Sequence, residues 1–121
     1  MVKLSGGAKV ASQEKLGVKL SGDVKDSAQS SKEGMYKRSL DIVNGKSYWT
    51  QEEGINAIWF DKVYGNWKIG SKEGLGSSTA GIRSNANVDE PQDAKIWQYY
   101  STDSKTWIKS NETEVSPGND T

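Results

Sequence analysis

The chain has 121 residues, of which 33% are hydrophobic, and its 16 basic and 16 acidic side chains cancel. This length predicts a single domain. The balanced charge and a pI near 6.3 argue against a nucleic-acid-binding protein, which typically carries clustered Lys and Arg and is strongly basic.

No apolar run approaches the roughly 20 residues of a membrane helix, and the first residues lack the apolar segment of a signal peptide. We therefore expect a soluble chain without membrane insertion, and the sequence does not specify its localisation. The chain also lacks cysteine and histidine. These absences exclude disulfides, nucleophile systems that depend on Cys or His, and the usual structural zinc site.

Two carboxylates alone can catalyse glycoside hydrolysis, so acidic residues are the remaining catalytic candidates. Six candidates lie in predicted turns or at strand ends, where solvated carboxylates are ordinary: Glu52, Glu53, Asp61, Asp89, Glu90 and Asp93. We therefore predict a protein that is not an enzyme and has no cofactor. A carboxylate-based hydrolase is the least favoured alternative.

Residues 1–15 are predicted to be a flexible or loosely held N-terminal segment, or alternatively an edge strand or a leader. They contain Val2-Lys3-Leu4-Ser5-Gly6, which recurs intact as Val18-Lys19-Leu20-Ser21-Gly22. The second copy lies in a period-2 pattern in which Leu16, Val18 and Leu20 alternate with Gly17 and Lys19. This alternation predicts the first strand of the domain, and the polar stretch from 23 to 33 predicts a loop.

Asn44-Gly45 predicts a type I′ hairpin turn between strands over 35–43 and 46–50, because both residues accept positive φ. In a two-residue turn, Val43 pairs with Lys46, and Leu40 pairs with Trp49. Leu40, Ile42 and Trp49 would then share one face of the hairpin, and we expect that face to be core.

The stretch 56–61 is nearly continuous apolar sequence, which is typical of a central strand covered on both sides. Residues 62–66 predict a turn into a second strand at 67–70. The bracketing glycines leave segments too short for a helix, and the aromatic content favours strands. Trp49, Trp59 and Trp67 are assigned to the core.

Later segments predict a loop at 71–79, a short strand at 80–83 and a polar loop at 84–94. A hairpin follows at 95–109, with its turn at Ser101-Thr102-Asp103-Ser104. From Asn111 onward only Val115 is apolar, so we predict a disordered tail over 111–121. The fold class is all-β: one domain over 16–110, a small antiparallel sandwich or barrel of about seven or eight short strands joined by hairpins.

Aromatic side chains are the best candidates for a binding site, because exposed Trp and Tyr offer a rigid apolar face and a polar edge. In the hairpin at 95–109, Trp97 and Tyr99 face one way and Tyr100 and Trp107 the other. Both faces cannot be core unless the sheet is covered on both sides. The candidate ligand-binding residues are Tyr48, Tyr64, Tyr99, Tyr100 and Trp107.

Asn85, Asn87 and Asp89 have the i, i+2, i+4 spacing of oxygen ligands that begins a calcium-binding loop. The sixth position of such a loop needs glycine, which is Glu90 here. The twelfth needs a bidentate glutamate, which is Ile96 here. A plain polar loop is the favoured interpretation, so we predict no metal site and keep these three residues as a weak calcium candidate.

The order of short motifs resembles small all-β accessory modules in multidomain proteins of invertebrates and protists. The shared pattern is Leu-Ser-Gly, Gly-x-Tyr, Val-Asn-Gly, Trp-x-Ile-Gly and a final Trp, which here begin at Leu20, Gly34, Val43, Trp67 and Trp97. The resemblance spans residues 18–108. It implies a β fold and an interaction module, and it supplies no catalytic residue.

The leading functional prediction is therefore a non-enzymatic module that binds a protein or a carbohydrate through surface aromatics. The alternative is a structural or assembly protein in which strand edges and the repeated pentapeptide add strands to a neighbour. The oligomeric state does not follow from the sequence.

Overall fold

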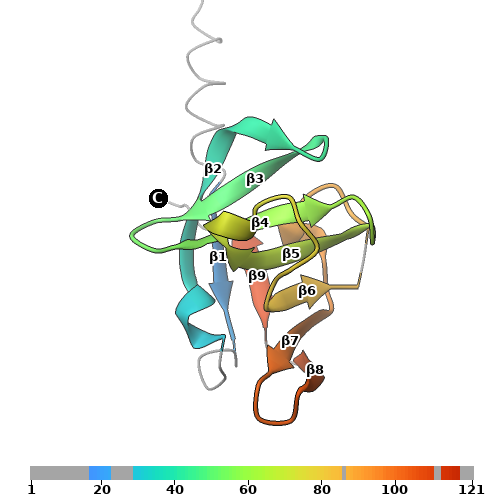
Figure 1. Cartoon of the computed structure of the whole chain (residues 1–121). Helices are drawn as coiled ribbons and strands as arrows, with labels where there is room; N and C mark the ends of the chain where they lie inside the picture. Colours follow the sequence, from blue (N-terminus) through green and yellow to red (C-terminus); the bar gives the residue numbers. More distant parts are fainter. Residues whose placement is uncertain (1–16, 23–28, 86, 111–112, 118–121) are drawn as a thin grey trace, which may run out of the picture.

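The structure is a computed structural model that describes residues 17–22, 29–85, 87–110 and 113–117 (Figure 1). These residues form one antiparallel sheet of nine strands, curled into a half-barrel. The strands are β1 (Val18–Ser21), β2 (Gly34–Val43), β3 (Lys46–Gln51), β4 (Asn56–Asp61), β5 (Asn66–Ser71), β6 (Ile82–Ser84), β7 (Trp97–Ser101), β8 (Thr106–Ser110) and β9 (Glu114–Pro117). Three short 3-10 turns accompany them: η2 (Ser30–Lys32), η3 (Lys72–Gly74) and η4 (Pro91–Asp93). The predicted all-β class is confirmed, with nine strands in place of seven or eight.

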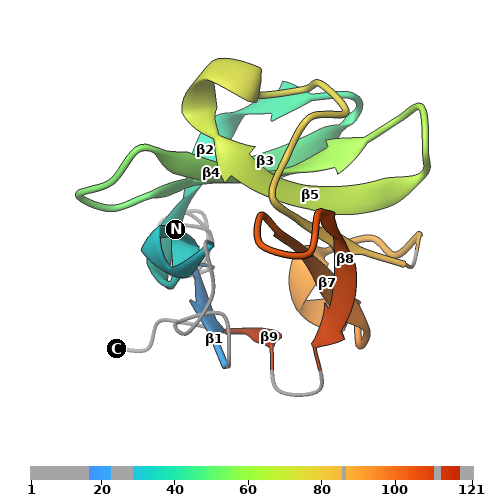
Figure 2. The same ribbon diagram turned by 60° about the horizontal axis from the view of Figure 1, so that its bottom comes forward.

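The sheet is a meander from β1 to β8, and β9 returns to pair with the far side of β1. In Figure 2, β2 to β5 form the upper wall, and β1, β9, β7 and β8 curve round beneath them. The two edge strands, β8 and β9, follow one another in the chain, and hydrogen bonds join the last residue of β8 to the residue before β9. There the backbone N–H of Thr113 donates to Ser110 Oγ over 3.0 Å, and the two hydroxyls are also hydrogen-bonded.

The strand β9 corrects the prediction of a disordered tail from residue 111. Glu114–Pro117 pairs with β1, and Val115 is buried in the core. A four-residue segment with one apolar side chain gives little local signal, and its order depends on a strand near the other end of the chain. The expected flexible segment at 1–15 lies outside the described residues.

The core lies on the inner face of the curled sheet. Along each strand, core members alternate with residues of the outer face, as the period of a β-strand requires. The buried cluster comprises Val18, Leu20, Tyr36, Trp49, Ile58, Phe60, Trp67, Ile69, Ile82, Ala94, Trp97 and Val115. At its centre the Trp67 ring meets those of Trp49 and Phe60 edge to face, with centroids 5.8 and 5.6 Å apart.

The central strand β4 is buried along its whole length, as its apolar sequence predicted. Its inner side packs into the core, and its outer side is covered by the loop that follows β5. The Trp59 indole N–H donates to the Ser77 carbonyl over 2.8 Å, which joins β4 to this loop. A Cβ on Gly70 would lie 3.0 Å from Ala80 Cα, so the loop also approaches β5 closely.

The β2–β3 hairpin corrects one predicted face. Its turn is as expected, with φ of 55° at Asn44 and 84° at Gly45, and Val43 pairs with Lys46. A bulge between Arg38 and Ile42 then shifts the register, so that Arg38 lies opposite Trp49. Leu40 is 94% exposed and Ile42 is 68% exposed, so neither belongs to the core.

Candidate binding surface

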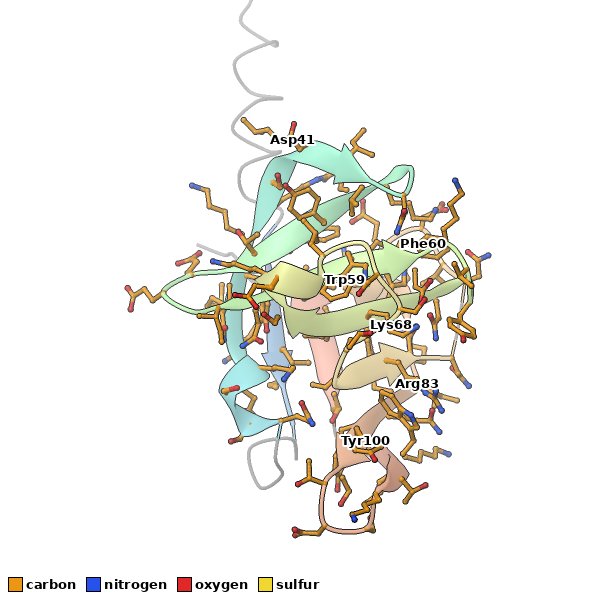
Figure 3. The ribbon with its side chains drawn as sticks, in the orientation of Figure 1. Asp41, Trp59, Phe60, Lys68, Arg83 and Tyr100 are labelled. Atoms are coloured by element: carbon orange, nitrogen blue, oxygen red, sulfur yellow. The ribbon has the colours of Figure 1, made fainter. Side chains whose placement is uncertain are left out.

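The outer face of β5 to β8 carries a row of polar and aromatic side chains. Strand pairing sets Lys68 opposite Arg83, Arg83 opposite Gln98, and Gln98 opposite Lys109. Directly opposed residues of antiparallel strands share a face and lie within contact distance. Figure 3 shows Lys68, Arg83 and Tyr100 following one another across β5, β6 and β7.

Tyr100 and Trp107 form the aromatic part of this surface. They are paired across β7 and β8, and their rings meet edge to face with centroids 5.6 Å apart. The Arg83 guanidinium lies over the Trp107 ring, 4.1 Å from its centroid, and donates from Nε to Gln98 Oε1 over 2.7 Å. All four side chains are partly exposed, so this cluster is held in place and still open to solvent.

The row continues to the turn between β4 and β5. Here the Lys68 ammonium lies 4.9 Å from the centroid of the Tyr64 ring, and Tyr64 is 70% exposed. Lys68 is itself 4% exposed, and its ammonium is 2.6 Å from Asp61 Oδ2 and 2.7 Å from Asn66 Oδ1. We call Tyr64, Lys68, Arg83, Trp107 and Tyr100 the aromatic–cation row.

Asp61 is the buried anion that compensates the charge of Lys68. Burial acts to raise the pKa of Asp61, but hydrogen bonds from Lys68, from Ser78 and from the Tyr64 backbone N–H outweigh it. The pKa therefore lies below the ordinary value. The Asp61 carboxylate also accepts a hydrogen bond from the Val63 backbone N–H over 2.9 Å. These backbone hydrogen bonds hold the turn that carries Tyr64.

The strand β8 is an edge of the sheet, so one side of its backbone has no strand partner within the described residues. The Tyr100 N–H donates to the Gly81 carbonyl over 2.8 Å and therefore points away from β8. Opposed residues in an antiparallel pair direct their backbone groups either at each other or away from each other. Trp107, which lies opposite Tyr100, thus turns its backbone N–H and C=O toward the free edge.

The structure distributes the five predicted aromatic residues over three places. Tyr64, Tyr100 and Trp107 lie on the aromatic–cation row. Tyr99 is on the inner face, partly buried against the core and opposite Ile108, so it shares a face with Trp97 as predicted. Tyr48 is half-buried on β3, in the hairpin that carries the exposed Leu40.

The three weak calcium candidates lie together in the loop between β6 and η4. Asn85 and Asn87 are exposed, and Asp89 has a side chain that is 96% exposed and lies 3.6 Å from the Lys46 ammonium. Among residues 17–22, 29–85, 87–110 and 113–117, no group of three or more Asp or Glu side chains could hold a metal ion. That this loop holds no metal stays a prediction, and the three residues stay the weak calcium candidate.

Sequence reasoning missed the cations of the row. Lys68 and Arg83 each occupy an outward position in a predicted strand, and such positions ordinarily carry solvated charge. They lie beside the aromatic residues only because β5 pairs with β6 and β6 pairs with β7. Long loops join these strands, so the sequence did not predict the pairing. The sequence held one signal for them. Each cation occupies an outward strand position, and a nearby hairpin carries aromatic residues at its own outward positions.

No protein-family model matches the chain, and the comparisons with curated proteins and with solved structures also gave no match. Within the part of the chain that the structure describes, no helix has the length and apolar character to span a membrane.

Proposed function

We propose that the protein is a non-enzymatic binding module that recognises a protein partner through the aromatic–cation row. The observation that carries this proposal is the cluster of Arg83, Trp107 and Tyr100, which is held by ring and hydrogen-bond contacts and remains partly exposed. Trp, Tyr and Arg are the residue types most enriched among the residues that dominate protein–protein binding energy. A surface already ordered before binding loses less side-chain entropy on association.

A protein partner is favoured over a carbohydrate for two reasons. Sugar rings stack on an open aromatic face, and the Arg83 guanidinium already covers one face of Trp107. The backbone of Trp107 faces the free edge of β8, where an extended peptide can add a strand while its side chains contact the row. A carbohydrate has no equivalent use for that edge.

Binding of the full chain to an array that carries both peptides and glycans tests this proposal. We expect peptide ligands whose affinity falls at least tenfold in Trp107→Ala and in Arg83→Ala. Tyr48→Ala is the matched control, because Tyr48 is a half-buried aromatic residue outside the row. Ligands that are exclusively glycans, or peptide binding that is unchanged in Trp107→Ala, would contradict the proposal.

Self-assembly is the second candidate, and the β2–β3 hairpin favours it. Leu40 and Ile42 are both exposed on this hairpin, at 94% and 68%. Exposed apolar side chains that lie together commonly mark an interaction surface. If the chain assembles through them, its mass in solution should exceed that of a monomer, and Leu40→Lys/Ile42→Lys should restore the monomer mass. A wild-type monomer at all concentrations would remove this candidate.

A further inference from the structure

The pentapeptide that forms β1 occurs twice in the chain. Val2-Lys3-Leu4-Ser5-Gly6 is identical to Val18-Lys19-Leu20-Ser21-Gly22, and each copy is followed three residues later by a lysine, Lys9 or Lys25. The second copy contains β1. The first copy lies outside the described residues.

The β1 site is a slot between two strands. In it Val18 pairs with Tyr36 of β2 and Pro117 of β9, and Leu20 pairs with Val115 of β9. Val18 is 0% exposed and Leu20 is 1% exposed. A strand that fills this slot therefore needs apolar side chains at positions i and i+2, which point into the core, and a residue between them that can be exposed. Val2, Lys3 and Leu4 supply the same three side chains in the same order.

We propose that residues 2–5 exchange with residues 18–21 for the β1 slot of the same chain. This inference does not depend on the proposed binding function. Residues 2–5 have the same sequence as residues 18–21, so they can make the same pairing and the same core contacts, and the sheet would be complete with either copy. A segment tethered to its site by a short linker has an effective concentration on the order of millimolar, roughly a thousandfold above a micromolar solution of separate chains. Exchange within one chain is therefore favoured over donation from a second copy.

Two features make residues 18–21 the major occupant. With the first copy in the slot, the connection to η2 comprises residues 6–29 instead of 22–29, three times as many. Loop-closure entropy then disfavours the first copy by about fivefold. In addition, a Cβ on Gly17 would lie 2.9 Å from the Tyr36 carbonyl oxygen, and the residue that precedes the first copy is Met1. The first copy is a spare strand that takes over when β1 is weakened.

Disulfide trapping tests the exchange, and the absence of native cysteine makes the background clean. Lys19 lies directly opposite Ser116, away from the core, and opposed residues have the separation that a disulfide needs. Lys19→Cys/Ser116→Cys is the positive control for β1. Lys3→Cys/Ser116→Cys reports the first copy in the slot, and Lys9→Cys/Ser116→Cys controls for random collision. Each pair is made in the wild-type chain and in Val18→Asp/Leu20→Asp.

In the otherwise wild-type chain, the disulfide yield of Lys3→Cys/Ser116→Cys should be at least fivefold below that of the positive control and above that of the Lys9→Cys control. In Val18→Asp/Leu20→Asp it should rise to nearly the positive-control yield, as a bond within one chain. A yield no higher than that of the Lys9→Cys control in this background would overturn the proposal. Bonds formed mainly between two chains would overturn exchange within one chain.

Thermal unfolding, followed by tryptophan fluorescence, gives an independent readout. Val18→Asp/Leu20→Asp should keep a cooperative transition, because the first copy fills the slot. Adding Val2→Asp/Leu4→Asp should abolish that transition, and Val2→Asp/Leu4→Asp alone should unfold as the wild type does. If Val18→Asp/Leu20→Asp loses its cooperative transition to the same extent as the variant with all four substitutions, the first copy does not replace β1.

Discussion

Two hairpins of this sheet are equally rich in tryptophan and use it differently. In the β4–β5 hairpin, Trp59 and Trp67 are both 0% exposed, although they point to opposite faces of the sheet. In the β7–β8 hairpin, Trp97 on the inner face is 0% exposed, whereas Trp107 on the outer face is partly exposed. The alternation of the strands is the same in both.

The difference arises from what lies over the outer face. The loop after β5 covers Trp59, and the Ser77 carbonyl accepts a hydrogen bond from its indole. The Trp107 ring contacts two side chains, the Arg83 guanidinium over its face and the Tyr100 ring edge to face. An outward aromatic residue is therefore structural where a loop crosses it, and it is available for binding where neighbouring side chains alone contact it. The predictions that follow compare these two hairpins, from the largest expected effect to the smallest.

Replacing Trp67 by alanine should have the largest effect on stability. The ring fills the centre of the core against Trp49 and Phe60, and its indole N–H donates to the Val88 carbonyl over 2.8 Å. Deletions of buried aromatic side chains cost about 3–5 kcal/mol. Urea unfolding of Trp67→Ala should show a loss of this size, whereas a loss below about 1 kcal/mol would show that the β4–β5 hairpin is not the centre of the core.

The buried ion pair should come next. Asp61→Asn removes the anion beside the 4% exposed Lys68, and an uncompensated buried charge costs about 3–5 kcal/mol. Asp61→Asn/Lys68→Met removes both charges and should recover part of the loss. Chemical denaturation of the single and double variants measures this. If the loss in the double variant equals the sum of the losses in Asp61→Asn and in Lys68→Met, the pair is not coupled.

Acid should weaken the same hairpin. The pKa of Asp61 is lowered in the folded state, so its contribution to stability is complete above the unfolded value of about 3.9. As the pH falls below about 4 and through the folded pKa, this contribution is lost, because the unfolded chain binds the proton first. The stability of Asp61→Asn should fall less steeply in this range. Melting temperatures from about pH 5 to about pH 2 would show parallel curves if Asp61 were irrelevant.

Trp107→Ala should have the smallest effect on stability, about 1–2 kcal/mol. It removes an edge-to-face ring pair and a cation–π contact, each worth roughly 0.5–1.5 kcal/mol at a partly exposed site. Urea unfolding beside Trp67→Ala measures the contrast between the hairpins. Equal losses in the two variants would remove the distinction between core and surface aromatics on which the proposed site depends.

Local patterns in the sequence predicted most of the fold. Asn44-Gly45 identified its turn because the positive φ of both residues is a local property. The apolar run at Asn56–Asp61 identified a strand buried on both faces. The alternation of residues along the β7–β8 hairpin predicted the opposite faces of Tyr99 and Tyr100. The turn itself lies one residue later than predicted, at 102–105, because Ser101 pairs with Thr106.

Features that depend on distant pairing were not predictable in this way. The bulge that exposes Leu40 lies in a regular-looking strand, and the Asp41 backbone N–H there donates to Ser39 Oγ in place of the expected ladder. The strand β9 forms only because β1 offers an edge. For the candidate site, the aromatic residues could be proposed from composition and alternation. Their link to Lys68 and Arg83 required the order and register of four strands.

The most direct test of the account is the quenching of tryptophan fluorescence by acrylamide. All five tryptophans lie within the described residues, and Trp49, Trp59, Trp67 and Trp97 are each 0% exposed. The wild-type protein should therefore show one readily quenched component, which Trp107→Phe should remove while the other four remain protected. A quenched component that persists in Trp107→Phe would contradict the claim that the β7–β8 hairpin presents the open aromatic surface.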